Sequence, residues 1–240
     1  GDNAGAALGV GATVGDVVVS VGTSGTVFAV TEDPTADVTG LVAGFADATG
    51  NFLPLAATLN ASRVLDATAG VLGVDLPALT ELALSAEPGA GGLSLVPYFE
   101  GERTPNLPEA QGSLHGMTLA NYTPANLARA AFEGVACSLA DAFRAVTGLG
   151  IEARRVILVG GGARSAAMQQ TLSSVLGMPV DVPEPGEYVA DGAARQAAAV
   201  LAGAWPEWKT QDSLTVSAPP APQVLERYRA AAQRQYSTTG

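Results

Sequence analysis

The pattern of apolar and polar positions predicts its clearest strands near the start of the chain. Residues 17–21 form a run rich in valine, residues 22–25 carry turn-forming glycines, and residues 26–30 form a second apolar run. Runs of β-branched residues on either side of a glycine turn are typical of paired antiparallel strands. We therefore expect a β-hairpin over residues 17–30.

The longest periodic segment begins near Pro124 and predicts a helix. Thr123 is a suitable N-cap, and proline suits the first helical position. Apolar side chains then recur at spacings of three and four residues, which places them on one face of a helix. They are Leu127, Ala131, Val135, Leu139, Phe143 and Val146. Gly148 is expected to end the helix.

Shorter segments before and after this helix alternate in type. Apolar runs predict strands, whereas helical spacing or small-residue composition predicts helices. The expected strands cover residues 41–45, 93–96, 155–159 and 179–182, and the expected helices cover residues 4–14, 55–70, 165–176, 187–201 and 225–236. Strands that alternate with helices predict an α/β fold.

Composition and charge narrow the classes of function. The 240 residues contain 23 acidic and 12 basic side chains, a net charge of -11, so nucleic acid and anionic membrane are expected to be poor partners. A single cysteine excludes an internal disulfide framework and any zinc site built on cysteine clusters. No apolar run reaches the ~20 residues of a membrane span. The chain opens without a secretory signal, and we expect a cytoplasmic protein.

Two glycine-rich turns carry the strongest candidate chemistry. Residues 160–165 (GGGARS) join a strand to a helix, where glycine lets backbone N–H groups approach an anion or a flat ring. Residues 22–26 (GTSGT) offer hydroxyls and amides that can wrap phosphate oxygens. Each turn alone has an ordinary structural explanation as a tight connection or a hairpin turn. Together in one chain they favour a nucleotide, whose phosphates and base need separate cradles.

The second turn along the chain also permits a dinucleotide-binding interpretation. A Rossmann fingerprint needs G-x-G-x-x-G and an acidic residue about 20 positions later. Gly160, Gly162 and Asp181 fit that pattern, but Ser165 stands where the third glycine belongs. The sequence alone leaves this alternative open.

Charged and polar residues supply the remaining candidates. Asp2 precedes a small-residue segment, so its carboxylate is either a helix N-cap or a base that takes a hydroxyl proton during phosphoryl transfer. Asn3 is placed to orient the hydroxyls of an acceptor. Glu100, Glu102 and Arg103 form a dense charge cluster, which is either functional or a solvated loop with a local ion pair.

The order of these motifs resembles the C-terminal domain of the FGGY carbohydrate kinases, and within that family most closely the xylulokinases. The resemblance covers nearly the whole chain in six segments: GDNAGAALGVG at 1–11, VSVGTSGTVFAV at 19–30, VPYFEGERTPNLPEAQGSLHGMT at 96–118, RAAFEGVACSL at 129–139, VGGGARSAAMQQTLSSVLGMPVDVP at 159–183 and VADGAARQAA at 189–198.

This resemblance implies an actin-like ATPase fold of the ribonuclease H-like kind, with a mixed sheet and helices on both faces. Residues 1–240 then form the C-terminal domain, with residues 219–240 as a helical tail. The N-terminal domain of the family lies outside this sequence, and no methionine opens the chain. We therefore expect a fragment of a longer protein.

The resemblance also implies roles for individual residues. Asp2 is the implied base, and Asp2 and Asn3 are the implied contacts to the sugar. The implied contacts to the ATP phosphates are Gly22, Thr23, Ser24 and Gly25. The implied contacts to adenosine are Gly161, Gly162 and Ala163. Arg63 falls at a further nucleotide-contacting position. Ala166 stands near the place where some relatives use an asparagine to reach the base. ATP and Mg²⁺ are implied, and no metal ligand is assigned.

The implied activity is ATP-dependent phosphorylation of a sugar, most closely D-xylulose to D-xylulose 5-phosphate. This chain is the implied ATP-binding half, which is expected to transfer no phosphate without the N-terminal domain. Three alternatives remain open from the sequence. They are another FGGY kinase acting on ribulose, gluconate or glycerol, a Rossmann-like dinucleotide-binding domain, and a non-catalytic actin-like regulator.

Overall fold

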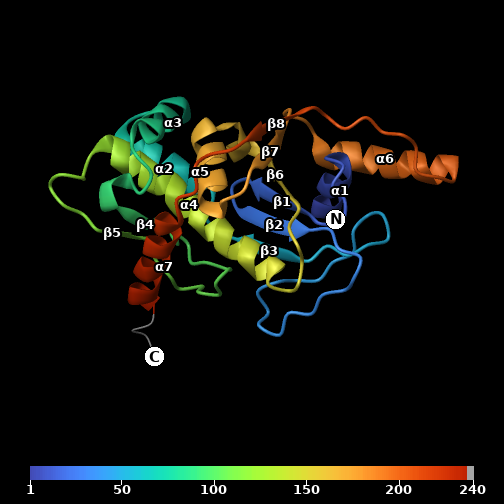
Figure 1. The fold of residues 1–240 in the computed structure, drawn as a ribbon, viewed down its shortest axis with the longest axis horizontal. Coiled ribbons are helices and arrows are strands. Elements are labelled where there is room, and N and C mark those ends of the chain that lie inside the picture. Colours follow the sequence, from blue (N-terminus) through green and yellow to red (C-terminus); the bar gives the residue numbers. More distant parts are fainter. Residues whose placement is uncertain (237–240) are drawn as a thin grey trace.

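A mixed six-stranded sheet forms the centre of the computed structural model, which describes residues 1–236 (Figure 1). Its strands lie in the order β3-β2-β1-β6-β7-β8. Their bounds are β1 (Asp16–Val21), β2 (Gly25–Ala29), β3 (Leu55–Thr58), β6 (Arg155–Val159), β7 (Val180–Pro183) and β8 (Ser213–Val216). Strand β1 runs antiparallel to β2 and parallel to β6. Strands β4 (Ser94–Val96) and β5 (Ser113–His115) form a separate antiparallel pair.

Helices cover both faces of this sheet, as the resemblance implies. Their bounds are α1 (Asp2–Gly9), α2 (Ser62–Leu72), α3 (Leu76–Ser85), α4 (Pro124–Thr147), α5 (Ala166–Leu176), α6 (Tyr188–Ala202) and α7 (Pro222–Tyr236), with short 3₁₀ turns η1 (Ala90–Gly92) and η2 (Gly161–Arg164). Successive side chains of a strand point to opposite faces. Val17 and Val19 of β1 therefore join the core formed with α2, α3, α4, α5 and α7, whereas Val18 joins a smaller cluster with Ala7 of α1 and Tyr188 of α6.

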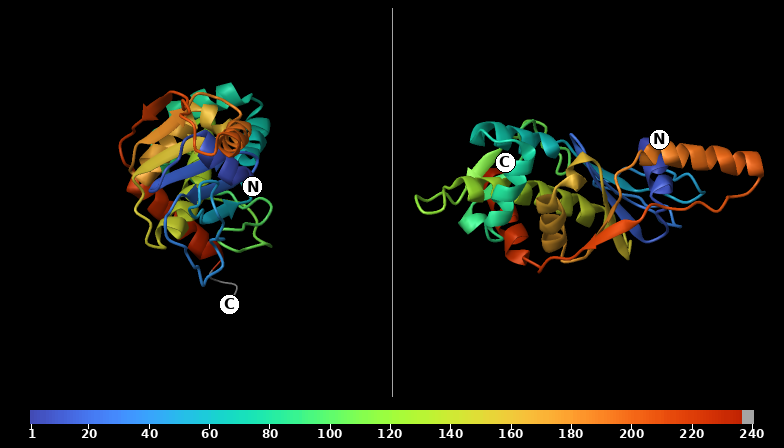
Figure 2. Two further views of the ribbon diagram at one scale, coloured as in Figure 1. Left: turned by 90° about the vertical axis from the view of Figure 1, so that its right-hand side faces the viewer. Right: turned by 90° about the horizontal axis from the view of Figure 1, so that it is seen from above.

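Helix α6 extends away from the rest of the molecule beside α1 (Figures 1 and 2). Glycines allow the two helices to approach closely, because a Cβ on Gly192 would lie 1.9 Å from the carbonyl oxygen of Gly5. Gly192 is the buried residue of α6, and Val200 and Leu201 near its end are 80% and 92% exposed. This helix thus presents apolar side chains to solvent within the described part of the chain.

Most of the predicted elements are confirmed. The hairpin over residues 17–30 is β1 and β2, and the predicted long helix is α4, where the Thr123 hydroxyl caps the N–H of Asn126 at 3.3 Å. Strands β6 and β7 and helices α5 and α6 fall where apolar runs and small-residue segments predict them. Of the predicted tail over residues 219–240, residues 222–236 form α7, and residues 237–240 lie outside the described residues.

The prediction of one helix over residues 55–70 is wrong. Residues 55–58 form β3, whose Leu55 and Thr58 pair with Phe28 and Gly25 of β2, and α2 begins only at Ser62. The apparent helical spacing joined a buried strand residue, Leu55, to the first turns of the next helix. Residues 41–45 form no strand, and Ala43 makes only an isolated bridge to Leu55.

The sequence interpretation missed α3 and β8. An N-cap signal for α3 is present, because Asp75 accepts a hydrogen bond of 2.9 Å from the N–H of Ala78 and a proline stands in the first turn. Strand β8 is largely exposed at the sheet edge, so it lacks the apolar pattern of a buried strand.

The antiparallel pairing of β1 with β2 also bears on the dinucleotide alternative. A Rossmann sheet is built on parallel strands joined through crossover helices. Here β1, β2 and β3, one half of the sheet, are successive antiparallel neighbours, and only a short turn joins β1 to β2. That topology does not fit the Rossmann-like interpretation.

Candidate functional site

The turn of the β1–β2 hairpin presents polar groups to solvent from a rigid base. Thr23 and Ser24 are exposed, and the Gly22 N–H donates a 3.0 Å hydrogen bond to the Ser24 carbonyl. Gly25 is buried, and a Cβ there would lie 2.6 Å from both the Leu139 and the Thr58 side chains. Only glycine fits at the base of the turn without displacing its neighbours.

The glycine turn after β6 lies directly against the end of β1. Gly160 has a φ of +92°, in a region that favours glycine, and a Cβ there would lie 2.6 Å from the Val21 carbonyl oxygen. A Cβ on Gly162 would lie 2.5 Å from Cγ1 of the same valine. Because Gly22 follows Val21, the two glycine-rich turns are neighbours at the carboxyl edge of parallel strands β1 and β6.

A pocket of about 730 Å³ opens beside the glycine turn, between that turn and helices α2 and α3. Its apolar walls include Leu65, Leu76 and Phe132, and Asp66, Thr80 and Glu81 add polar groups. Ser62 at the start of α2 lines the pocket and donates its N–H to the Gly22 carbonyl at 3.0 Å. Through Ser62, one wall of the pocket is therefore hydrogen-bonded to the hairpin turn.

The residues predicted to face adenosine border this pocket in part. Gly161 and Gly162 line it, and so does Ala166, which brings no polar group to it. Ala163 is buried and lies instead along a second pocket. The hydroxyls of Thr80 on α3 and Ser165, the residue just before α5, form a hydrogen bond of 2.8 Å. The sequence interpretation missed this contact.

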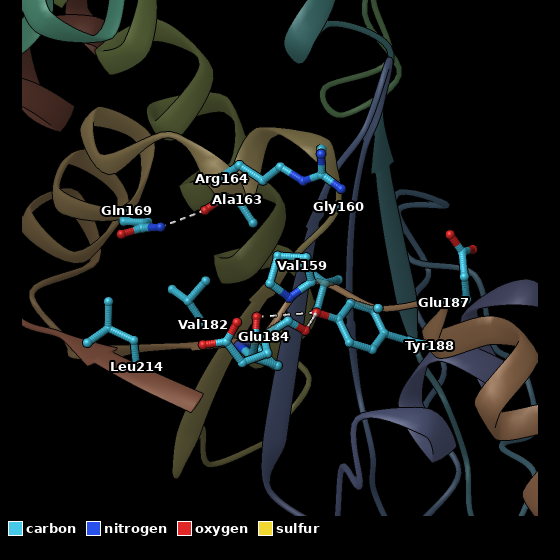
Figure 3. A pocket seen from close by; sticks show the side chains of 14 residues that line it. Val159, Gly160, Ala163, Arg164, Gln169, Val182, Glu184, Glu187, Tyr188 and Leu214 are labelled. Atoms are coloured by element: carbon cyan, nitrogen blue, oxygen red, sulfur yellow. Dashed lines mark hydrogen bonds between the residues drawn. The ribbon is translucent and has the colours of Figure 1, made fainter. Parts of the chain in front are cut away.

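The second pocket, of about 450 Å³, lies between the glycine turn and residues 182–188 (Figure 3). Gly161 and Arg164 border both pockets. Gln169 Nε2 holds the turn by donating to the Ala163 carbonyl at 2.7 Å, and the Tyr188 hydroxyl donates to the Glu184 carbonyl at 2.6 Å. Burial raises the pKa of Tyr188, so this phenol stays a neutral donor at physiological pH.

The predicted base stands at the start of α1. Asp2 is exposed and Asn3 is half-buried, in the first turn of that helix. At the other end of α1, a Cβ on Gly9 would lie 1.9 Å from the Tyr188 carbonyl oxygen, beside the second pocket. A rise of 1.5 Å per residue places the two ends of α1 about 10 Å apart. The role of Asp2 stays a prediction.

Arg63 lies on the first turn of α2, next to Ser62. Its guanidinium forms a bidentate ion pair with Glu100, with Nη2 at 2.6 Å from Oε1. The two side chains are 51% and 56% exposed, so the arginine is accessible near the hairpin turn. Its predicted contact with the nucleotide is not tested by these distances.

The charge cluster at residues 100–103 is only partly the solvated loop that its composition suggests. Arg103 is exposed, and Glu100 pairs with the distant Arg63 rather than with a near neighbour in the sequence. Glu102 is 1% exposed and accepts a hydrogen bond of 2.7 Å from the Leu59 N–H. A charge count along the chain gives no signal that one carboxylate of such a cluster is buried.

Two absences hold for residues 1–236, the part of the chain that the structure describes. Within that range no group of three or more histidine, cysteine, aspartate or glutamate side chains is arranged to hold a metal ion. No single helix there has the length and apolar composition of a membrane span, although α2 and α3, bent by 87°, meet those two criteria as a pair.

The chain matches a known family and known structures. Residues 17–201 match the model of the FGGY family of carbohydrate kinases, C-terminal domain. The chain is 47% identical over 216 residues to a xylulose kinase of Streptomyces rubiginosus, which covers 88% of this chain and 43% of that protein. It is 39% identical over 206 residues to the xylulose kinase of Escherichia coli, covering 82% and 42%. The chain thus spans less than half the length of these relatives.

Solved structures give the same assignment. The crystal structure of a xylulose kinase from Bifidobacterium adolescentis superposes with a TM-score of 0.89 at 51% identity, over 97% of this chain and 46% of that one. A glycerol kinase of Plasmodium falciparum with ADP has a TM-score of 0.79 at 16% identity, over 99% and 49%, a likeness of fold alone. These neighbours have the actin-like ATPase fold, as the sequence resemblance implies. The chain belongs to the FGGY family of carbohydrate kinases.

Proposed function

We propose that this chain is the ATP-binding half of an ATP-dependent sugar kinase that converts D-xylulose to D-xylulose 5-phosphate. The observation that carries the proposal is the meeting of two glycine-rich turns beside one pocket of about 730 Å³. The xylulose kinases among the relatives, at 47% identity, support the choice of sugar.

The nucleotide is proposed to span the two turns. Adenosine enters the pocket between α2 and α3 and packs against Gly161 and Gly162, because the walls there are apolar and these two residues carry no Cβ. The phosphates then reach the hairpin turn, where Thr23 and the backbone of Gly22, Ser24 and Gly25 face them. Amides arranged in such a turn bind anions without a cationic side chain.

Asp2 is the proposed base, and Asn3 orients the sugar. The Asp2 carboxylate takes the proton of a sugar hydroxyl, whose oxygen forms a bond to the γ-phosphorus of ATP. The bond from that phosphorus to the bridging oxygen breaks, and ADP leaves with the electron pair. Phosphoryl transfer needs mostly positioning and charge stabilisation, so one well-aimed carboxylate suffices as the base.

Mg²⁺ is the metal that a kinase of this type uses, and it would neutralise phosphate charge. Magnesium is usually held by one or two carboxylates together with substrate phosphates. Residues 1–236 contain no cluster of three acidic, histidine or cysteine ligands. We therefore assign no residue of this chain as its ligand, and we propose that it arrives with ATP.

The N-terminal domain of the same kinase is the proposed partner of the extended α6. The relatives are more than twice as long as the matched segment, and the matching family model is of a C-terminal domain. Val189, Val200 and Leu201 are 44%, 80% and 92% exposed, an apolar surface that a second domain can bury. Backbone amides of α6 should exchange with solvent more slowly when that domain is attached, and equal exchange rates in both forms would argue against the contact.

The proposed reaction is tested on the complete protein, whose setting we propose to be the cytoplasm. ADP release is measured with ATP, Mg²⁺ and, in turn, D-xylulose, ribulose, gluconate and glycerol. Fastest turnover with D-xylulose is expected, and a clear preference for another acceptor would move the chain to another FGGY activity. Relatives named gluconokinase and glycerol kinase match at 32% and 35% identity, which makes gluconate and glycerol the necessary comparisons. The 240-residue chain alone is expected to be inactive, and measurable xylulose phosphorylation by it would contradict the division into halves.

A further inference from the structure

The loop over residues 98–110 is fastened to the segment that precedes α2. Glu102, which is 1% exposed, accepts hydrogen bonds from the N–H of Leu59 at 2.7 Å and from Nδ2 of Asn60 at 3.0 Å. Asn60 Nδ2 also donates to the Gly101 carbonyl at 2.6 Å, and the Thr104 hydroxyl donates to the Ala57 carbonyl at 2.8 Å. The loop therefore grips the end of β3 and the following residues at several points.

The groups that donate hydrogen bonds to the Glu102 carboxylate are all neutral. Glu102 also accepts from the N–H of Arg103 at 2.7 Å, so its two oxygens receive backbone and amide hydrogen bonds. Hydrogen bonds to an ionised group are shorter and stronger than neutral ones. A buried carboxylate is costly unless such donors are kept in place. The loop and the segment it grips are thus locked in one arrangement.

The segment from Thr58 to Ser62, which contains Leu59 and Asn60, contacts the hairpin turn at both of its ends. Thr58 pairs with Gly25 in the β2–β3 register, and the Ser62 N–H donates to the Gly22 carbonyl at 3.0 Å. Leu59 and Asn60, which Glu102 holds, lie between these two points. A shift of Leu59 and Asn60 would therefore move the groups that fix both sides of the hairpin turn.

We propose that Glu102 is a positioning residue for the phosphate-binding hairpin. Its carboxylate holds Leu59 and Asn60, which fix Ser62 and Thr58 against Gly22 and Gly25, so the turn keeps the shape that receives phosphates. This inference rests on the proposed function. It assigns a role in the binding of the phosphates, and none in the binding of adenosine, to a residue that need not touch the nucleotide.

The test compares Glu102→Gln with Glu109→Gln in the complete protein. Glu109 is an exposed carboxylate of the same loop and serves as the matched control. A glutamine at position 102 turns an N–H₂ toward one of the donors that the carboxylate accepts from. Equilibrium dialysis with labelled ADP and labelled adenosine is expected to show an ADP affinity about tenfold lower for Glu102→Gln, with adenosine affinity changed by less than about twofold. Glu109→Gln should match the parent for both ligands.

Hydrogen exchange gives an independent measurement. The Ser62 amide should exchange faster in Glu102→Gln than in the parent, because the segment that carries it is no longer held against the Gly22 carbonyl. If Glu102→Gln does not fold, Asn60→Ala replaces it, and the same preferential loss of ADP affinity is expected at smaller size.

The outcomes separate the two proposals. Unchanged ADP affinity in a folded variant, or an equal loss for ADP and adenosine, would overturn the positioning role. A parent protein that binds no ADP would overturn the proposed function itself, and the positioning role with it.

Discussion

The glycine turn after β6 offers a comparison between adjacent residues that separates folding from nucleotide binding. Gly160 has a φ of +92°, and a Cβ there would lie 2.6 Å from the Val21 carbonyl oxygen. For Gly161, the next residue, no heavy atom lies within 4 Å of a Cβ, and its φ is not positive. We predict that Gly160→Ala destabilises the protein and that Gly161→Ala does not.

The magnitude for Gly160→Ala follows from two costs. A side chain in a sparsely populated backbone region costs about 1–3 kcal/mol, and overpacking costs about 1–3 kcal/mol more. Val21 lies on the central strand β1 and is fully buried, so its carbonyl cannot move aside cheaply. The sum is about 2–6 kcal/mol. The free energy of unfolding of a domain is roughly 5–15 kcal/mol, so this cost is a large part of it.

Gly161→Ala is expected to change the free energy of unfolding by less than about 0.5 kcal/mol. Its new methyl group enters the space where adenosine is proposed to lie, because Gly161 lines the pocket. Crowding of about 1–3 kcal/mol corresponds to an ADP affinity lower by a factor of about 5 to 150.

Urea denaturation followed by circular dichroism gives the free energy of unfolding, and equilibrium dialysis gives the ADP affinity of the complete protein. A Gly160→Ala variant as stable as the parent would refute the packing argument. Unchanged ADP affinity in Gly161→Ala would refute the placement of adenosine against the turn.

Three further predictions concern single side chains. Asp2→Asn in the complete protein should lower turnover by a factor of about 10² to 10⁴ with ADP affinity unchanged, and turnover at the parent rate would show that Asp2 is not the base. Arg63→Ala removes an exposed ion pair, so the free energy of unfolding should change by less than about 1 kcal/mol while ADP binds more weakly, and undiminished binding would remove Arg63 from the site. Glu133 on α4 is buried and accepts a hydrogen bond of 2.8 Å from Nε of Arg129. Burial outweighs this partner and raises the pKa of Glu133 above its ordinary value of 4.5, so the stability this group contributes is complete below that pH and is lost as the pH rises through the raised pKa. Urea denaturation at a series of pH values should show that Glu133→Gln removes this part of the pH dependence, and identical profiles would contradict the assignment.

The sequence predicted the hairpin and the glycine turns because their signals are local. Short apolar runs, glycines at the turns and a threonine–proline start are read within a few positions, and β1, β2 and α4 formed accordingly. The segment over residues 55–70 was predicted wrongly because the identity of β3 depends on its pairing with β2, a contact between distant residues. No local pattern distinguishes Leu55 on a buried strand from Leu55 on a helix face.

The site was predictable in its turns and less so in its walls. Gly160 and Gly162 need to be glycine because Val21 lies against them, and the turn motif already pointed to a close approach. The pocket wall formed by α3 was missed together with that helix. The buried Glu102 was missed for a different reason, since its donors on Leu59 and Asn60 are more than forty positions away. Only the folded chain shows which carboxylate of the cluster they hold.

The most direct test of the account is a crystal structure of the complete protein with ADP. The account predicts adenosine in the pocket between α2 and α3, against Gly161 and Gly162, with the phosphates on the turn from Gly22 to Gly25. Adenosine in the pocket beside Tyr188, or phosphates away from that hairpin turn, would contradict the claim that the two turns hold one nucleotide.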